Sequence, residues 1–240
     1  MTVVFYALVA TLISAAFAGT LWMQYRVKPR PYLLVWSVAL AFYAIAALTE
    51  VIGAAGGWTP LLYRTYYFFG AIVLVGLLAL GTIYLLAPRF SRVALWALIV
   101  LAAIGLAGML GAQLQAVKLE THQVPNADTI QIQGGLFSVL AILMAALINI
   151  VGSVILIGGA AWSAYAAWRR GGASSRVLAN VLIAAGAFIV AGASSLTRVF
   201  HVYDVFYVGQ AIGVLVMFGG FLAVQRAPRR ASALNPATSR

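Results

Sequence analysis

Residues 61–87 read LLYRTYYFFGAIVLVGLLALGTIYLLA, and this stretch decides the fold class. A membrane-spanning helix needs about 20 mostly apolar residues, and Arg64 is the one charged residue in this stretch. We therefore predict a transmembrane helix here. Its first turns carry a cluster of aromatic side chains around a single arginine.

Six further apolar runs flank this one, and charged residues, proline or glycine interrupt the chain between most of them. The sixth and seventh runs are separated only by the short segment HVY, at 201–203. The sequence predicts an all-α, polytopic membrane protein with a seven-helix transmembrane domain over 1–226 and a disordered cytoplasmic tail over 227–240. The predicted spans lie at roughly 3–25, 32–54, 61–87, 93–112, 135–168, 177–200 and 203–225.

The composition agrees with a membrane protein. Hydrophobic residues make up 64% of the chain and charged residues 8%, whereas soluble domains carry about 25% charged residues. We expect a multi-pass protein of the cell membrane, surrounded by the lipid bilayer. The net charge of +11 would suggest a nucleic-acid partner in a soluble protein. Here the positions of the charges indicate topology instead, so no nucleic-acid partner is expected.

The basic residues predict the orientation in the membrane. Those that follow spans one, three and five, together with those of the tail, all fall on one side, and only Arg64, Lys118 and Arg198 fall on the other. Because lysine and arginine favour the cytoplasmic side, the N-terminus is predicted to lie outside and the C-terminus in the cytoplasm. Cleavage of the first span as a signal peptide, after the small residues Ala16 and Ala18, is the alternative. No basic residue precedes that span, which counts against cleavage.

The sequence also contains a candidate internal repeat. Residues 63–89 align with 203–229 without a gap, so that Tyr67 meets Tyr207 and Arg64 falls opposite Asp204. Two parallel copies of a three-helix unit are then predicted; chance similarity between apolar, aromatic segments is the alternative. The predicted parts are repeat one at 1–92, a linker helix at 93–112, an outer loop at 113–134 and repeat two at 135–226.

The charges near the predicted outer surface define a candidate site. The expected ion pairs are Glu50–Arg64 and Arg198–Asp204, with a crossed Arg64–Asp204 pair as a further option, because charges near the membrane usually pair inside the bundle. One interpretation is an interfacial aromatic belt with structural ion pairs at helix ends. The other is an outward-facing pocket with aromatic walls. The candidate ligand-binding residues are Glu50, Tyr63, Arg64, Tyr67, Arg198, Asp204, Tyr207 and Gln210.

Several kinds of chemistry are not expected. There is no cysteine, so thiolate metal sites and disulfides are excluded. His122 and His201 are the only histidines, and both lie outside the predicted span centres. No catalytic residue, metal site or cofactor is therefore predicted. Asn149, near the middle of span five, is expected to make an interhelical hydrogen bond, and Gly105, Gly108 and Gly111 are expected to let span four pack closely against its neighbours.

The layout resembles two families. Seven spans with an external N-terminus in a 3+1+3 arrangement resemble the microbial rhodopsins, and Asp204-Val-Phe-Tyr-Val208 is similar to the aspartate-x-x-x-lysine of their last helix. Val208 stands at the lysine position, so no retinal linkage is implied. Trp36 and Glu50 in span two also resemble the seven-span sensor regions of bacterial histidine kinases, although no kinase domain follows here. Transporters of the SWEET type share the 3+1+3 plan, but their proline-glutamine signature is absent.

Three functions follow from these observations. The first is a non-enzymatic sensor or accessory protein whose outer pocket binds a small or lipophilic ligand, or whose helices bind a membrane-protein partner or a second copy of the chain. The second is a structural subunit of a larger membrane complex. The third is a small transporter of an apolar substrate.

Overall fold

A computed structural model describes residues 2–125, 127–169, 182, 185, 186, 188, 189 and 208–220. The chain divides into two compact units, Met1–Leu156 and Ile157–Arg240, and each is described here by itself. The described residues are helical apart from their connections, and they contain no strand beyond an isolated bridge between Leu114 and Ile130. The predicted all-α class is therefore confirmed for this part of the chain.

The first unit is built from long apolar helices joined by short connections. Five helical stretches in the described residues are long and apolar enough to cross a membrane, at Val4–Val27, Pro31–Gly56, Pro60–Leu86, Pro88–Gly111 and Leu136–Ser163. They coincide with the first five predicted spans. The elements are α1 (Thr2–Val27), α2 (Pro31–Gly56), α3 (Pro60–Tyr66), the π-helix η1 (Tyr67–Val73), α4 (Leu74–Leu86), the 3₁₀ turn η2 (Pro88–Phe90), α5 (Ser91–Gly111) and α6 (Leu136–Arg169), of which α6 continues beyond Leu156.

Proline and glycine set the helix ends. Pro31, Pro60 and Pro88 each occupy a first position of their helices, where the missing N–H costs nothing because it would have no partner there. Gly57 ends α2 with φ of +88°, a conformation that L side chains rarely adopt, and its N–H donates to the Gly53 carbonyl. Thr59 then caps α3 by accepting a hydrogen bond from the Leu62 N–H at 3.2 Å.

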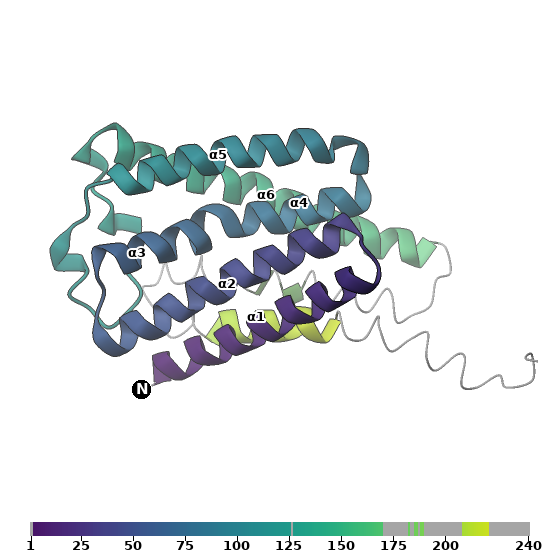
Figure 1. The fold of residues 1–240 in the computed structure, drawn as a ribbon, viewed down its shortest axis with the longest axis horizontal. Helices are drawn as coiled ribbons and strands as arrows, with labels where there is room; N and C mark the ends of the chain where they lie inside the picture. Colours follow the sequence, from purple (N-terminus) through teal and green to yellow (C-terminus); the bar gives the residue numbers. More distant parts are fainter. Residues whose placement is uncertain are drawn as a thin grey trace, which may run out of the picture. The chain divides into compact units, whose positions relative to one another are not determined.

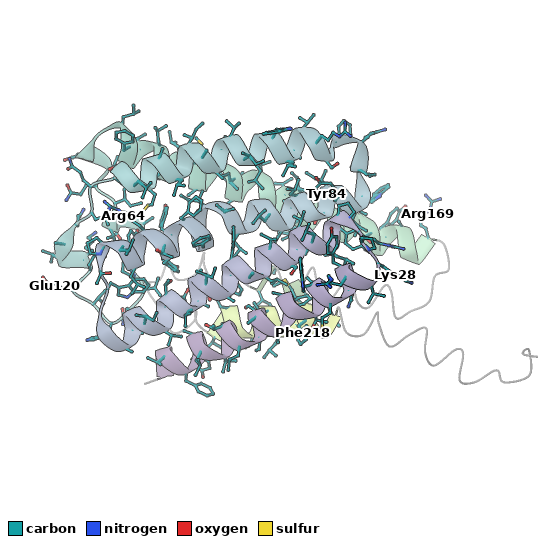
Figure 2. All side chains as sticks on the ribbon, in the orientation of Figure 1. Lys28, Arg64, Tyr84, Glu120, Arg169 and Phe218 are labelled. Atoms are coloured by element: carbon teal, nitrogen blue, oxygen red, sulfur yellow. The ribbon has the colours of Figure 1, made fainter. Side chains whose placement is uncertain are left out.

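The connections of this unit lie alternately at its two ends. Figure 1 shows the α2–α3 turn and the segment between α5 and α6 at one end, and the α1–α2 and α4–α5 connections at the other. In Figure 2, Arg64 and Glu120 lie at the first end and Lys28 lies at the second. The second end carries a concentration of basic residues in and beside the α1–α2 and α4–α5 connections, which are Arg26, Lys28, Arg30, Arg89 and Arg92.

Small residues and a few hydrogen bonds hold the helices together. The Ser37 hydroxyl of α2 donates to the Ala18 carbonyl of α1 at 2.9 Å. The Trp36 indole of α2 donates to the Leu78 carbonyl of α4 at 3.0 Å. Its ring also covers Gly81, where an added Cβ would lie 2.1 Å from the indole nitrogen.

The glycines of α5 confirm the prediction of close packing. A Cβ at Gly108 would lie 2.7 Å from the backbone nitrogen of Ala141 on α6, and a Cβ at Gly111 would lie 2.6 Å from the Phe137 ring. At Gly105 the nearest atom, a methyl group of Ile72, would be 2.9 Å away. No side chain larger than hydrogen fits at these positions unless the neighbouring atoms move.

The third apolar stretch differs from its prediction. The sequence predicts one continuous helix at 61–87, whereas the structure has α3, the seven-residue π-helix Tyr67–Val73 and then α4. Apolar content does not distinguish i→i+4 from i→i+5 hydrogen bonding, so the sequence pattern carries no signal for this change. Asn149 of α6 donates from its amide to the Ala71 carbonyl inside the π-helix, which confirms the predicted interhelical hydrogen bond.

The second unit is described over fewer residues. An apolar helix covers Val208–Gly220, within the predicted seventh span. A Cβ at Gly186 would lie 2.5 Å from the Gly213 carbonyl, so two helical segments of this unit are in close contact. Most of the sixth span and the tail at 227–240 lie outside the described residues, and the seven-span count and the repeat stay predictions.

Candidate functional site

The candidate site starts from a carboxylate inside an apolar helix. Glu50 lies in the second half of α2 and is 1% exposed. Tyr43, two turns earlier on the same face, is buried and close enough to interact electrostatically with Glu50. A buried ionisable group in a membrane span is costly, and such groups usually mark functional positions. Glu50 is therefore the centre of the candidate site.

Aromatic side chains of α3 and of the residues around it are buried at the same end. Tyr63 is 0% exposed and Tyr67 is 5% exposed, and their ring centroids lie 5.7 Å apart. Trp58 is also buried, packs edge-on against Tyr66 at 5.5 Å and covers Gly53. An interfacial belt would present its rings to lipid and water. These rings are instead packed inside the protein.

Arg64 donates a hydrogen bond to a backbone carbonyl. Its Nη2 donates to the carbonyl of Ala112, just after α5, at 3.1 Å, and the predicted Glu50–Arg64 ion pair is not formed. Within the described residues, the recorded ion pair is Lys118–Asp128 at 2.5 Å. The physical reason is the path of the chain after α5, which brings a carbonyl within reach of the guanidinium.

The segment 112–135 forms an ordered cover over this end, which the sequence predicted only as a polar loop. The Gln115 N–H donates to the Thr129 carbonyl and the Gln131 N–H to the Gln113 carbonyl, both at 2.9 Å. The cover also contains three short 3₁₀ turns, Ala116–Lys118, Ala127–Thr129 and Ile132–Gly134. These hydrogen bonds hold residues 113–115 of the loop against residues 129–131.

The cover is tied to the helices below it. His122 lies with Nδ1 3.0 Å from the Ala54 carbonyl of α2, and the Thr129 side chain lies beside the Tyr63 phenol. Three of its apolar residues, Leu119, Val124 and Ile130, are buried, whereas Val117 and Ile132 are exposed. The apolar residues within this polar segment are a sequence signal that part of it packs against the helices, but their irregular spacing does not show which of them are buried.

The structure brings some of the predicted site residues to one end and leaves others undescribed. Glu50, Tyr63, Arg64 and Tyr67 lie at the covered end of the first unit. Gln210 lies on the helix Val208–Gly220 of the second unit. Arg198, Asp204 and Tyr207 lie outside the described residues, so the predicted Arg198–Asp204 and Arg64–Asp204 pairs stay predictions. Trp58, His122 and Thr129 also lie at this end, and none of them is among the predicted ligand-binding residues.

Buried hydrogen-bond donors lie at this end. The Trp58 indole N–H and the Arg64 Nε–H are buried and have no hydrogen-bond partner in the described part of the chain. Among those residues no group of three His, Cys, Asp or Glu side chains is placed to hold a metal ion. The cluster thus combines aromatic surface, two N–H donors and one buried carboxylate.

A shallow groove recorded elsewhere does not belong to this cluster. It runs along the exposed face of α5 and is lined by Arg92, Val93, Trp96, Ala97, Val100 and Leu101. Val93 and Trp96 are largely exposed, as expected of side chains that face lipid. We give more weight to the covered end, because buried polar groups there require an explanation and exposed apolar groups on a membrane helix do not.

Comparison of the chain with known protein families, with characterised proteins and with solved structures finds no match.

Proposed function

We propose that this chain is a non-enzymatic sensor or accessory protein of the cell membrane, and that its covered end binds a small or lipophilic ligand. The observation that carries the proposal is the burial of Glu50 at the end of the first unit that also holds the aromatic cluster formed by Trp58, Tyr63 and Tyr67. Glu50 lies one turn before Gly53, which the Trp58 ring covers. A protein that needed only apolar packing there would gain nothing from an ionisable group that is costly to bury.

The proposal includes seven spans, an external N-terminus and two parallel three-helix repeats. The concentration of basic residues at the end opposite Arg64 (Figure 2) supports this orientation, because positive residues favour the cytoplasmic side. The covered end is then the outer one. The cover at 112–135 limits access to the cluster, so a ligand enters when the cover moves or enters from the bilayer.

The donor groups indicate what the ligand offers. The buried N–H groups of Trp58 and Arg64 favour a ligand that has a carbonyl, carboxylate or ether oxygen, since a buried donor gains free energy when it meets an acceptor. The rings of the cluster favour an apolar or aromatic body. Both properties together describe an amphipathic small molecule.

The test is native mass spectrometry of the gently solubilised protein. We expect a small molecule at one copy per chain that is retained in Lys118→Ala and lost in Glu50→Gln and Tyr67→Leu. Lys118 is the matched control because it lies in the cover but pairs outward with Asp128. Retention of the same molecule in all three variants would place its site elsewhere.

A structural subunit is the second candidate, and the wide apolar face of α5 favours it, with Val93, Trp96 and Leu110 largely exposed. A co-purifying protein and no bound small molecule would support this candidate. Transport of an apolar substrate is the third, and uptake into proteoliposomes of the purified chain would be required to support it.

A further inference from the structure

The third apolar stretch changes its hydrogen-bond register near its middle. Tyr67–Val73 is a π-helix between α3 and α4, and all three belong to the unit Met1–Leu156. A π-helix closes i→i+5 bonds, so it accommodates one more residue than an α-helix over the same turn. One residue turns an α-helix by about 100° and advances it by about 1.5 Å. The π-helix therefore sets the rotation of α3 relative to α4.

Asn149 on α6 contacts the π-helix directly. Its Nδ2 donates to the Ala71 carbonyl and, at 2.7 Å, to the Ala145 carbonyl of its own helix. Both N–H donors of the amide are thus used. A helix carbonyl has two lone pairs and can accept such a bond from a side chain. Asn149 is half-buried in an otherwise apolar part of α6, where a polar group is retained at a cost.

Close packing holds α6 against the end of the π-helix. A Cβ at Gly152 would lie 3.0 Å from a Val75 methyl group, and a Cβ at Gly76 would lie 2.7 Å from an Ile148 methyl group. Along α6, Ile148 directly precedes Asn149 and Gly152 follows it by about one turn. Close packing of α6 against the start of α4 therefore helps to hold the amide near Ala71.

The other side of the π-helix faces α2. A Cβ at Gly70 would lie 3.2 Å from the Cβ of Ala46, and the rings of Phe42 and Phe69 meet at 4.6 Å. If the segment converted to a continuous α-helix with all residues kept, part of it would rotate by about 100°. Gly70 would then no longer face Ala46, and Tyr63 and Arg64 would turn relative to the cover.

We propose that Asn149 is a positioning residue for the covered end: its hydrogen bond to Ala71 holds the π-helix in register, and this register directs Tyr63 and Arg64 toward the segment 112–135. The significance of this device rests on the proposed function, because ligand binding at the cluster would be coupled to the register of a helix that reaches the membrane centre. The register itself can be measured without any ligand.

Disulfide cross-linking measures the register, since the chain has no native cysteine. Disulfides join Cβ atoms about 3.5–4.5 Å apart, so Ala46→Cys with Gly70→Cys should oxidise readily after a small shift. A reference pair is Gly105→Cys with Met144→Cys, whose Cβ atoms would lie 3.3 Å apart between α5 and α6. Because the added Cβ at Gly105 would also lie 2.9 Å from a methyl group of Ile72 in the π-helix, the effect of Asn149→Leu on this pair is compared with the same pair in the otherwise native chain. The rate of cross-linking of the 46–70 pair measures the register of the π-helix. The rate for the 105–144 pair measures whether α5 and α6 are packed as in the native fold.

Asn149→Leu is expected to slow formation of the 46–70 cross-link by roughly two- to tenfold, the range for one lost hydrogen bond. The 105–144 cross-link should form at an unchanged rate. Ser153→Ala, one turn further along α6, should leave both rates unchanged. Loss of both cross-links in Asn149→Leu, or of neither, would overturn the proposal, because the first indicates general damage and the second indicates that Asn149 does not hold the register.

A deletion provides a second test. Removing Phe68 takes the extra residue out of the π-helix and lets an α-helix form with both flanks in place. In this background the 46–70 cross-link should persist and should no longer respond to Asn149→Leu. An undiminished response there would show that Asn149 acts on general packing and not on the register. These cross-linking measurements need no ligand. They therefore test the role of Asn149 independently of the proposed binding function, which native mass spectrometry tests.

Discussion

Gly108→Ala is expected to destabilise the protein markedly although it adds a single methyl group. The added Cβ would lie 2.7 Å from the Ala141 nitrogen and 2.9 Å from the Phe137 carbonyl oxygen. Both are backbone atoms of α6, so no side-chain rotation can relieve the contact. Carbon needs about 3.5 Å from such neighbours, so α5 and α6 must separate locally by the better part of 1 Å.

The magnitude follows from the cost of overpacking. Forcing one extra methyl group into a well-packed interface costs typically about 1–3 kcal/mol, and the intrinsic helix preference of alanine over glycine returns roughly 0.5–1 kcal/mol. The net loss in the free energy of unfolding is therefore roughly 0–2.5 kcal/mol, and because backbone atoms block relief of the contact, a value in the upper half of this range is expected. The matched control is Gly19→Ala, because a Cβ at this exposed helical position would have no neighbour within 4 Å.

The assay is reversible unfolding in mixed micelles, followed by circular dichroism at increasing fractions of denaturing detergent. Gly108→Ala should unfold at a lower detergent fraction than the native chain, whereas Gly19→Ala should unfold at the same or a higher fraction. If Gly108→Ala and Gly19→Ala unfold together, α5 and α6 do not approach as closely as argued, and the reasoning is refuted.

Three further predictions concern side chains of the first unit. Trp36→Phe removes the hydrogen bond to the Leu78 carbonyl and should cost about 0.5–1.5 kcal/mol in the same assay; no loss would mean that this bond contributes nothing. Gly53→Ala would place a Cβ 2.3 Å from the Trp58 ring, so it should displace that ring and lower the thermal midpoint, whereas Gly56→Ala, with no neighbour within 4 Å, should not; equal midpoints would contradict the packing of Trp58. Asp128→Ala breaks an exposed ion pair with Lys118 and should change the free energy of unfolding by less than about 1 kcal/mol, so a larger loss would show that the pair holds the cover in place.

The sequence predicted the helices well because apolar length is a local property. The first five predicted spans match the long apolar helices to within a few residues, and Pro31, Pro60 and Pro88 marked three of the helix starts. The close approach at Gly105 and Gly108 was also predictable, since small residues on a membrane helix usually face another helix. The hydrogen bond of Asn149 followed from its polarity in an apolar span.

The candidate site was predicted only in part. The sequence placed Glu50, Tyr63 and Tyr67 at the same end of the helices, and the structure agrees, because all three lie near the α2–α3 turn. The predicted Glu50–Arg64 pair is not found among the described residues, because opposite charges in a sequence do not reveal which backbone carbonyl comes closer to Arg64. The burial of the rings depends on the segment 112–135, whose path over α2 and α3 is set by contacts distant in sequence, such as the one between His122 and Ala54.

The sequence by itself determined the all-α class, the positions of five helices long and apolar enough to cross a membrane, and the helix ends near which Glu50 and the aromatic rings lie. These properties depend on composition and on neighbours along one helix. Only the tertiary structure decided that Arg64 bonds to Ala112, that 112–135 covers the aromatic cluster and that a π-helix interrupts the third span. Each of these depends on contacts between segments that are distant in sequence, and the local sequence pattern does not show which distant segments meet.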